Sequence, residues 1–119
     1  MGEENGMKAI INGVSYPISL ADNELSNSIV KLLPFVVTMS RSAEHEYYAA
    51  LPGTPKTGTA MLTSHVKSGR VYYFKAWNAL ALNFRDMDIS PYQVYEVGTA
   101  EELSDILINS GSSLEERFE

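Results

Sequence analysis

The chain has 119 residues, no cysteine and a net charge of -6 at neutral pH. The absence of cysteine excludes a disulfide framework, thiolate chemistry and a cysteine-based zinc site. The acidic balance, without any basic cluster, disfavours nucleic acid as a partner because phosphates would be repelled. The hydrophobic content of 45% is too high for a disordered chain.

The termini and the apolar stretches argue against a membrane or secreted protein. The longest uncharged apolar stretch, Leu32 to Met39, is far too short to span a bilayer. The start of the chain has neither a basic region nor an apolar segment, so it is not a secretory signal. We therefore expect a cytoplasmic protein unless an upstream signal was removed, with residues 1–6 as a disordered tail and residues 7–119 as a single domain.

The ordered part opens with a strong hairpin pattern. Asn12-Gly13 separates two apolar segments, residues 8–11 and 14–20, and this dipeptide accepts the positive φ angles of a type I′ turn. Pro17 has no N–H group for a sheet ladder. The second strand is therefore expected at an edge or distorted at this residue.

A helix is predicted at about residues 23–33. Asp22 or Asn23 can cap its start, leucine and isoleucine recur at helical spacing, and Pro34 ends it. The polar residues 26–28 lie mostly off the apolar stripe and are expected to face water.

Three extended segments follow. A buried strand is predicted at residues 35–39, and alternation puts Met39 and Arg41 on the same side of it. Residues 44–51 indicate another strand, followed by a loop rich in proline and glycine. Residues 60–66 are apolar enough for a further strand or an extended segment on the core.

The most aromatic hairpin is predicted at residues 71–84. Its two apolar strands meet at residues 75–78, and Trp77, the only tryptophan, lies at this tip. Alternation sends one set of side chains to the core and leaves small residues on the opposite face. The two sets are Leu80, Leu82 and Phe84, and Ala79, Ala81 and Asn83.

The C-terminal part predicts a strand, a helix and a closing strand. Residues 92–97 alternate like a strand, and Gly98 is expected to break it. Thr99 and Glu102 have the spacing of a capping box that opens a helix ending near residue 108. Residues 112–119 indicate a closing strand by a weaker pattern.

Several short motifs occur in a recognisable order. They are the Ile-Asn-Gly hairpin, Leu32-Leu33-Pro34 before the strand at 35–39, Tyr48-x-x-Leu51-Pro52, the Gly69 turn into Tyr72-Tyr73-Phe74, Asn78-Ala79-Leu80-x-Leu82-x-Phe84, and the Gly98-Thr99 step into a helix. With this order the chain, from Met7 onward, resembles the small cyclophilin-like domains. The resemblance implies a mostly β fold, a closed barrel of about eight strands with two helices, roughly at residues 23–33 and 100–108.

The resemblance implies less about activity. Full-size cyclophilins are prolyl isomerases that use an arginine on the strand after the first helix, and Arg41 falls in a comparable strand. The downstream aromatic and amide residues of that pattern are missing, as is its Gln-Gly-Gly stretch. An isomerase-like enzyme is therefore kept only as an alternative, and no catalytic residue or cofactor is predicted.

Six residues are candidates for ligand binding, and several have a structural alternative. Arg41 could hold a carboxylate or a peptide carbonyl, or could reach solvent and pair with a nearby glutamate. Trp77 could be a ligand platform or a plug over the barrel end. Asn78 most simply supplies turn geometry. The candidates are Met39, Arg41, Tyr48, Phe74, Trp77 and Asn78.

The remaining polar residues suggest no chemistry of their own. His45 and His65 are expected at the surface, and no metal site is predicted because nothing makes ligands converge. The leading hypothesis is thus a cyclophilin-like domain of undefined activity that binds a small molecule or peptide in a shallow pocket. A protein-interaction module or oligomer that uses an exposed strand is the other alternative.

Overall fold

The first hairpin forms as the Asn-Gly turn predicts. In the computed structural model, which describes residues 6–42 and 44–119, β1 (Gly6–Ile11) pairs with β2 (Val14–Leu20). Asn12 and Gly13 have φ angles of 52° and 81°, the left-handed pair that a type I′ turn requires. The predicted tail falls mostly on residues 1–5, which lie outside the described residues.

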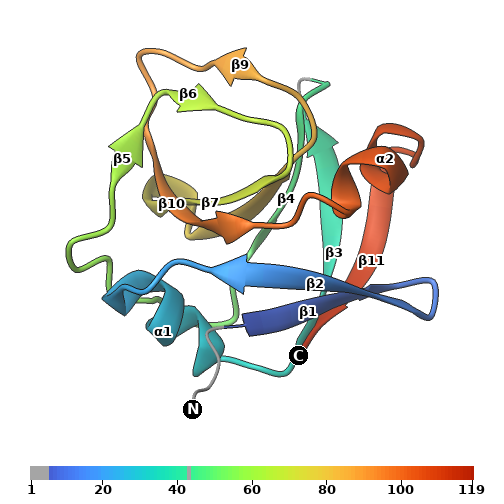
Figure 1. Ribbon diagram of the computed structural model, residues 1–119, viewed down its shortest axis with the longest axis horizontal. Coiled ribbons are helices and arrows are strands. Elements are labelled where there is room, and N and C mark those ends of the chain that lie inside the picture. Colours follow the sequence, from blue (N-terminus) through green and yellow to red (C-terminus); the bar gives the residue numbers. More distant parts are fainter. Residues whose placement is uncertain (1–5, 43) are drawn as a thin grey trace.

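The strands close into a barrel (Figure 1). Their order around the wall is β2-β1-β11-β3-β4-β8-β7-β10, and β10 pairs back with β2 to complete the ring. Every pairing in the wall is antiparallel. The other wall strands are β3 (Phe35–Ser42), β4 (Glu46–Ala50), β7 (Arg70–Phe74), β8 (Ala79–Asn83), β10 (Val94–Thr99) and β11 (Ser113–Phe118). Closure removes exposed strand edges, and the predicted mostly β barrel is confirmed.

Gly98 completes the barrel instead of ending its strand. The prediction that it breaks β10 is wrong, because Gly98 lies within β10 and pairs with Leu20 of β2. A Cβ atom at Gly98 would lie 2.2 Å from the backbone oxygen of Ser19. The close approach of β2 and β10 therefore requires a residue without a side chain, and a bulge between Glu96 and Gly98 adjusts the register.

Two helices lie outside the wall, as predicted, but their details differ. In α1 (Glu24–Val30) the Asn23 side chain accepts a hydrogen bond from the Ser26 N–H, which confirms the predicted cap. Ser26 itself is fully buried and its hydroxyl donates to the Val97 carbonyl at 2.9 Å, so the prediction that it faces water is wrong. The helix packs on β10 at this point, where a small polar residue can satisfy a strand carbonyl.

The second helix, α2 (Leu103–Ile108), begins without the predicted capping box. Its N-cap is Glu102, and no side-chain hydrogen bond caps it. Thr99 remains in β10, paired with Ser19 and Arg70, so a turn must intervene before the helix starts. Neither helix in the described part of the chain is long and apolar enough to cross a membrane.

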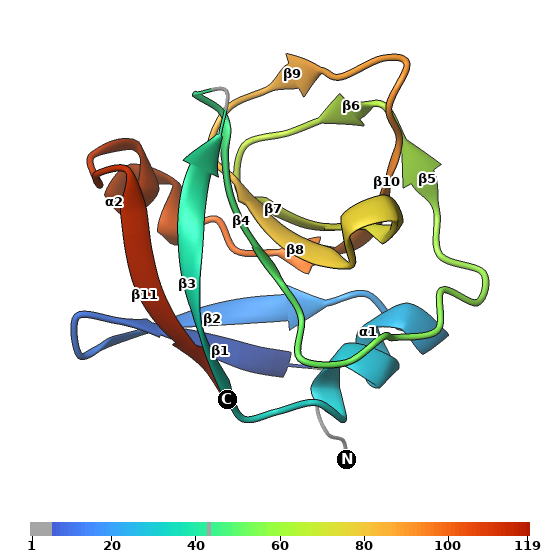
Figure 2. The same cartoon turned by 180° about the vertical axis from the view of Figure 1, so that it is seen from behind.

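A long excursion covers the outer face of β7 and β8. Residues 61–69 and 86–94, here called the arch, contain the short strands β5 (Leu62–Thr63), β6 (His65–Val66) and β9 (Met87–Asp88). β6 pairs with β9, and β5 adds to the edge of β10. Seen from behind, the arch curves over β7 and β8 on the side away from the β1–β2 hairpin (Figure 2). Residues 60–66 thus form two short strands instead of one.

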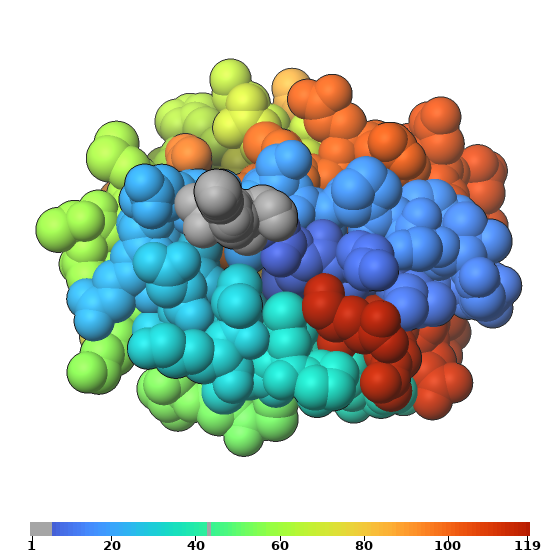
Figure 3. All heavy atoms as spheres, turned by 60° about the horizontal axis from the view of Figure 1, so that its bottom comes forward, coloured from blue at the N-terminus to red at the C-terminus, as the bar shows by residue number. Residues whose placement is uncertain are grey.

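The opposite side of the molecule is made by chain segments from both ends of the sequence. Atoms of α1, of β1 and of the end of β11 pack next to one another on this face (Figure 3). β11 lies between β1 and β3 and pairs with both. Phe118 of β11 is opposite Ala9 of β1 on one side and opposite Phe35 of β3 on the other. The C-terminal segment, which had the weaker sequence pattern, therefore forms a full strand of the barrel wall.

The wall separates two apolar clusters, and β8 lies between them. All five residues of β8 are buried. Leu80, Leu82 and Phe84 belong to the large cluster inside the barrel, whereas Ala81 belongs to a smaller cluster under the arch. The predicted division of this strand into a core face and a small-residue face is confirmed, and the small-residue face forms the floor of the site described next.

Candidate functional site

The small residues of β8 create a groove between two strands with larger side chains. Ala79 and Ala81 face outward from β8 and are flanked by Tyr48 of β4 and Phe74 of β7, with Tyr48 opposite Ala81 and Phe74 opposite Ala79. The arch forms the other wall through Ile89 and the residues up to Val94. The groove has a volume of about 690 Å³ and is partly open to solvent, within the usual size range of small-ligand sites.

Four aromatic rings gather at one end of this groove. The ring of Trp77, from the short 3-10 helix η1 (Lys75–Trp77), lies 5.6 Å from Tyr48 and 5.2 Å from Phe74, measured between centroids. Phe74 contacts Tyr92 of the arch edge-on at 6.2 Å. Trp77 and Tyr92 are 60% and 63% exposed, so the outer rings of this aromatic cluster can be covered by a ligand.

The other end of the groove is polar. His45 and Glu46 line it, and the His45 Nε2 atom lies 3.7 Å from a Glu46 carboxylate oxygen. Burial raises the pKa of Glu46 above its ordinary value, and the nearby His45 partly offsets this effect. The prediction that His45 is a surface residue is wrong, since only 6% of it is exposed. His65 is exposed as predicted and pairs with Asp88 on the arch.

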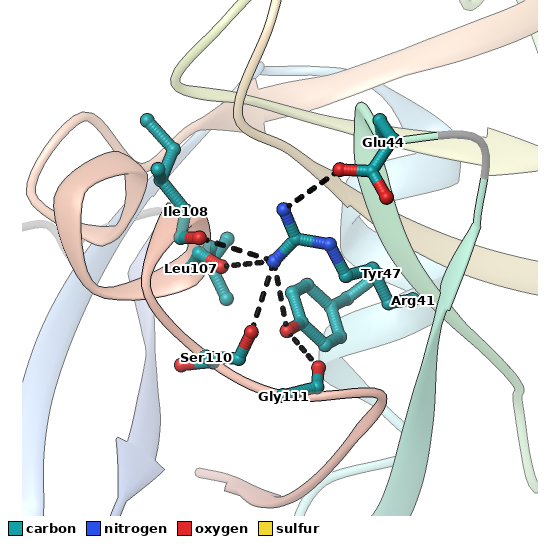
Figure 4. A network of polar contacts seen from close by, with 7 residues as sticks. All are labelled: Arg41, Glu44, Tyr47, Leu107, Ile108, Ser110 and Gly111. Atoms are coloured by element: carbon teal, nitrogen blue, oxygen red, sulfur yellow. Dashed lines mark hydrogen bonds and ion pairs between the residues drawn. The ribbon is translucent and has the colours of Figure 1, made fainter.

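Arg41 lies away from the groove and holds the end of α2 (Figure 4). Its Nη1 atom donates to the carbonyls of Leu107, Ile108 and Ser110 at 3.0, 3.2 and 3.0 Å. Its Nη2 atom donates to Glu44 at 3.2 Å. The guanidinium also lies 4.6 Å above the ring of Phe84. A positive charge at a helix C-terminus is favourable, and these acceptors use much of the donor capacity of the side chain.

With the fold and this geometry established, the chain can be compared with known proteins. Residues 9–119 match the sequence model of the cyclophilin-like family. The chain belongs to this family. The solution structure of a hypothetical protein from Archaeoglobus fulgidus is similar, with a TM-score of 0.70 and 19% identity, covering 100% of this chain and 98% of the other. No curated protein matches.

In this cyclophilin-like domain the structure brings together only part of the predicted candidate set. Tyr48, Phe74 and Trp77 line the groove, as an apolar site at the hairpin tip requires. Met39 is fully buried inside the barrel, on the other side of the wall. Arg41 shares that inward side of β3 and reaches α2. Alternation along β3 correctly placed these two residues together, but it could not show that their face is separate from the groove.

Asn78 shapes the hairpin tip, as its simpler interpretation predicted. It has a φ angle of 51°, in the left-handed region that asparagine tolerates. Its side chain accepts a hydrogen bond from the Tyr73 hydroxyl at 2.6 Å and donates to the Gly53 carbonyl at 3.0 Å. These bonds tie the tip to the loop after β4 and so set the position of the neighbouring Trp77.

Two important residues of the groove were missed from the sequence. Glu46 precedes Tyr48 by two positions on β4, so period-two alternation alone could have placed it on the same face. Tyr92 had no such signal, because the arch brings it to Phe74 across a long loop. In residues 6–42 and 44–119 no group of three or more histidine, cysteine, aspartate or glutamate side chains could hold a metal ion.

Proposed function

We propose that this cyclophilin-like domain binds a small molecule or a peptide in the groove above β8. The observation that carries the proposal is the aromatic cluster of Tyr48, Phe74, Trp77 and Tyr92 beside a floor of two alanines. Small residues flanked by aromatic rings leave a slot that accepts a flat or aliphatic group. Binding would bury the exposed faces of Trp77 and Tyr92.

The expected affinity follows from the apolar area that a ligand can cover. A ligand that buries about 200 Å² of apolar surface gains roughly 5 kcal/mol at about 25 cal/mol per Å². Losses of translational and side-chain freedom reduce this gain, so simple probes are expected to bind no more tightly than about the millimolar range. Screening must therefore use millimolar probe concentrations.

The test is a thermal-shift screen combined with tryptophan fluorescence. Trp77 is the only tryptophan, so its emission reports directly on the groove. A probe at about ten times its dissociation constant stabilises the folded state by roughly 1.4 kcal/mol and raises the melting temperature by several degrees. Groove ligands are expected to shift both the melting temperature and the emission of Trp77.

A filled groove provides the control. Ala81→Leu puts a larger side chain on the groove floor, opposite Tyr48, and leaves all four aromatic residues of the cluster in the sequence. It should abolish the probe response while the circular dichroism spectrum stays that of a folded barrel. Val36→Ala, at an exposed position on β3, should leave binding intact. A probe response that survives in Ala81→Leu, or no response to a broad library, would refute binding in the groove.

A further inference from the structure

The described residues that line the groove offer a cation one carboxylate and offer an anion neither lysine nor arginine. The titratable side chains that line it are His45, Glu46, Tyr48 and Tyr92, and His45 lies 3.7 Å from Glu46. The whole chain carries a net charge of -6. A cationic ligand would therefore meet Glu46 and a favourable overall charge, whereas an anionic ligand would be repelled by both.

The position of Glu46 sets the distance that a ligand must span from the aromatic rings. Glu46 and Tyr48 are two residues apart on β4, so their side chains leave the same face about 7 Å apart along the strand. The carboxylate is partly buried at the polar end of the groove, and it forms an ion pair with His45. A ligand that reaches from the rings to Glu46 needs an apolar body and a positively charged or donor group beside it.

The aromatic cluster favours the same ligand. The faces of tryptophan, tyrosine and phenylalanine rings attract organic cations, and methylated ammonium groups are recognised by several rings around one site. Phe74 and Trp77 stand nearly edge-on, with 77° between their planes, and Phe74 and Tyr92 make 88°. Rings at such angles form a corner instead of a flat stack, and a rounded ammonium group can contact more than one of them.

From these observations we infer that the groove takes a small organic cation, an ammonium group attached to an apolar or aromatic body, with Glu46 as the countercharge and the rings of Trp77, Phe74 and Tyr92 around the ligand. This inference rests on the proposed function, since it names the ligand class of the same groove. The groove volume of about 690 Å³ suits a free small molecule, so we assign the ligand to this class and not to a side chain of a peptide.

Three probes with one carbon frame test the assignment: phenylpropyl-trimethylammonium, phenylpropanol and phenylpropyl sulfonate. Titrations followed by Trp77 emission at physiological ionic strength should show the cation binding about tenfold more tightly than the alcohol, and the sulfonate most weakly. Glu46→Gln should bring the cation and the alcohol to within about twofold. Glu115→Gln removes the same charge from an exposed position of β11 and should keep the tenfold preference.

The outcomes separate this inference from the proposed function. If the alcohol binds as tightly as the cation, the groove still binds ligands but the cation assignment is wrong. If Glu115→Gln lowers the preference as much as Glu46→Gln does, the preference comes from the overall charge and the assignment is also wrong. If none of the three probes binds at millimolar concentration, the cation assignment fails, and the library screen decides whether the groove binds any ligand. A lysine peptide that binds more tightly than the free cation would overturn the small-molecule source. Should Glu46→Gln fail to fold, the order of the three probes on the unaltered protein still decides.

Discussion

Arg41 and Glu46 are two charged residues on the neighbouring strands β3 and β4, but their surroundings differ. The guanidinium of Arg41 donates to three carbonyls of the α2 end and to Glu44. Glu46 lies at the edge of an open groove, and burial raises its pKa. Arg41 donates to several acceptors of its own chain and so stabilises the fold, whereas Glu46, which forms an ion pair with His45, also borders open apolar space in which a ligand can lie.

Glu116 is a third ionisable residue, and it is buried away from both the α2 end and the groove. It is fully buried inside the barrel wall on β11, and among the described residues neither carboxylate oxygen has a hydrogen-bond partner. Burial raises the pKa of Glu116 from 4.5 to about 8. In the unfolded chain the same group titrates near 4.5, so folding is unaffected by it below that pH and becomes less favourable as pH rises from 4.5 to about 8.

The largest predicted effect follows from this shift. Glu116→Gln should raise the free energy of unfolding at pH 7 by on the order of 3 kcal/mol. At this pH the glutamate must take up a proton when the chain folds, whereas the amide does not. At pH 4 the two proteins should be equally stable. Denaturant unfolding across pH 4 to 9 measures this, with the exposed Glu115→Gln as the matched control. A parallel pH dependence in Glu116→Gln and the unaltered protein would contradict the assignment.

The next effect concerns Arg41. Arg41→Ala removes the side-chain donor of three carbonyls at the α2 end, of which that of Leu107 also accepts from the Ser110 N–H, and should lower the melting temperature by more than about 5 °C. Arg41→Lys keeps the charge but loses the fork of donors, so an intermediate melting temperature is expected.

The same variants show whether Arg41 belongs to the fold or to a site. Probe binding in the groove should be unchanged in Arg41→Ala, and a proline-peptide isomerisation assay should give equal rates with and without the substitution. Loss of probe binding at an unchanged melting temperature would reverse our interpretation and place Arg41 with the ligand site.

A smaller effect is expected at the hairpin tip that supports Trp77. Asn78→Ala both strains a left-handed backbone and removes the side-chain hydrogen bonds to Tyr73, Gly53 and Leu51, so a loss of about 1 to 3 kcal/mol is expected. Asn78→Gly relieves the backbone and loses only the bonds. Unfolding of both variants separates the two causes, and a red shift of the Trp77 emission would report a displaced tip. Equal stabilities of the two variants would mean that backbone strain contributes nothing.

The smallest effect is predicted for Glu44, the exposed partner of Arg41. Its side chain is 73% exposed, and exposed ion pairs contribute little to stability. Glu44→Gln should therefore change the melting temperature by less than about 1 °C. A larger loss would show that Arg41 depends on this carboxylate and not mainly on the carbonyls of α2.

Local patterns predicted much of the barrel because its strands and turns follow local rules. The Asn12-Gly13 turn requires two left-handed residues, and the strand faces of residues 79–83 follow from period-two alternation. Predictions failed where distant segments meet. Gly98 lies in a strand because β2 crosses it closely, and Ser26 is buried because α1 packs on β10. Neither contact leaves a signal in the neighbouring residues.

Hydrophobic alternation and turn residues act over a few positions, and they were sufficient to predict the class of the fold, its family and the aromatic hairpin at residues 71–84. Which side of the barrel wall each candidate residue faces depends on contacts between distant segments. Closure of the barrel buried Met39 inside it and brought Arg41 to the end of α2. The arch turned the outer face of β8 into a groove with Glu46 at one end. Long-range packing separates the barrel interior from the groove. The alternation of residues along a strand shows which side chains share a face, but it does not show what covers that face.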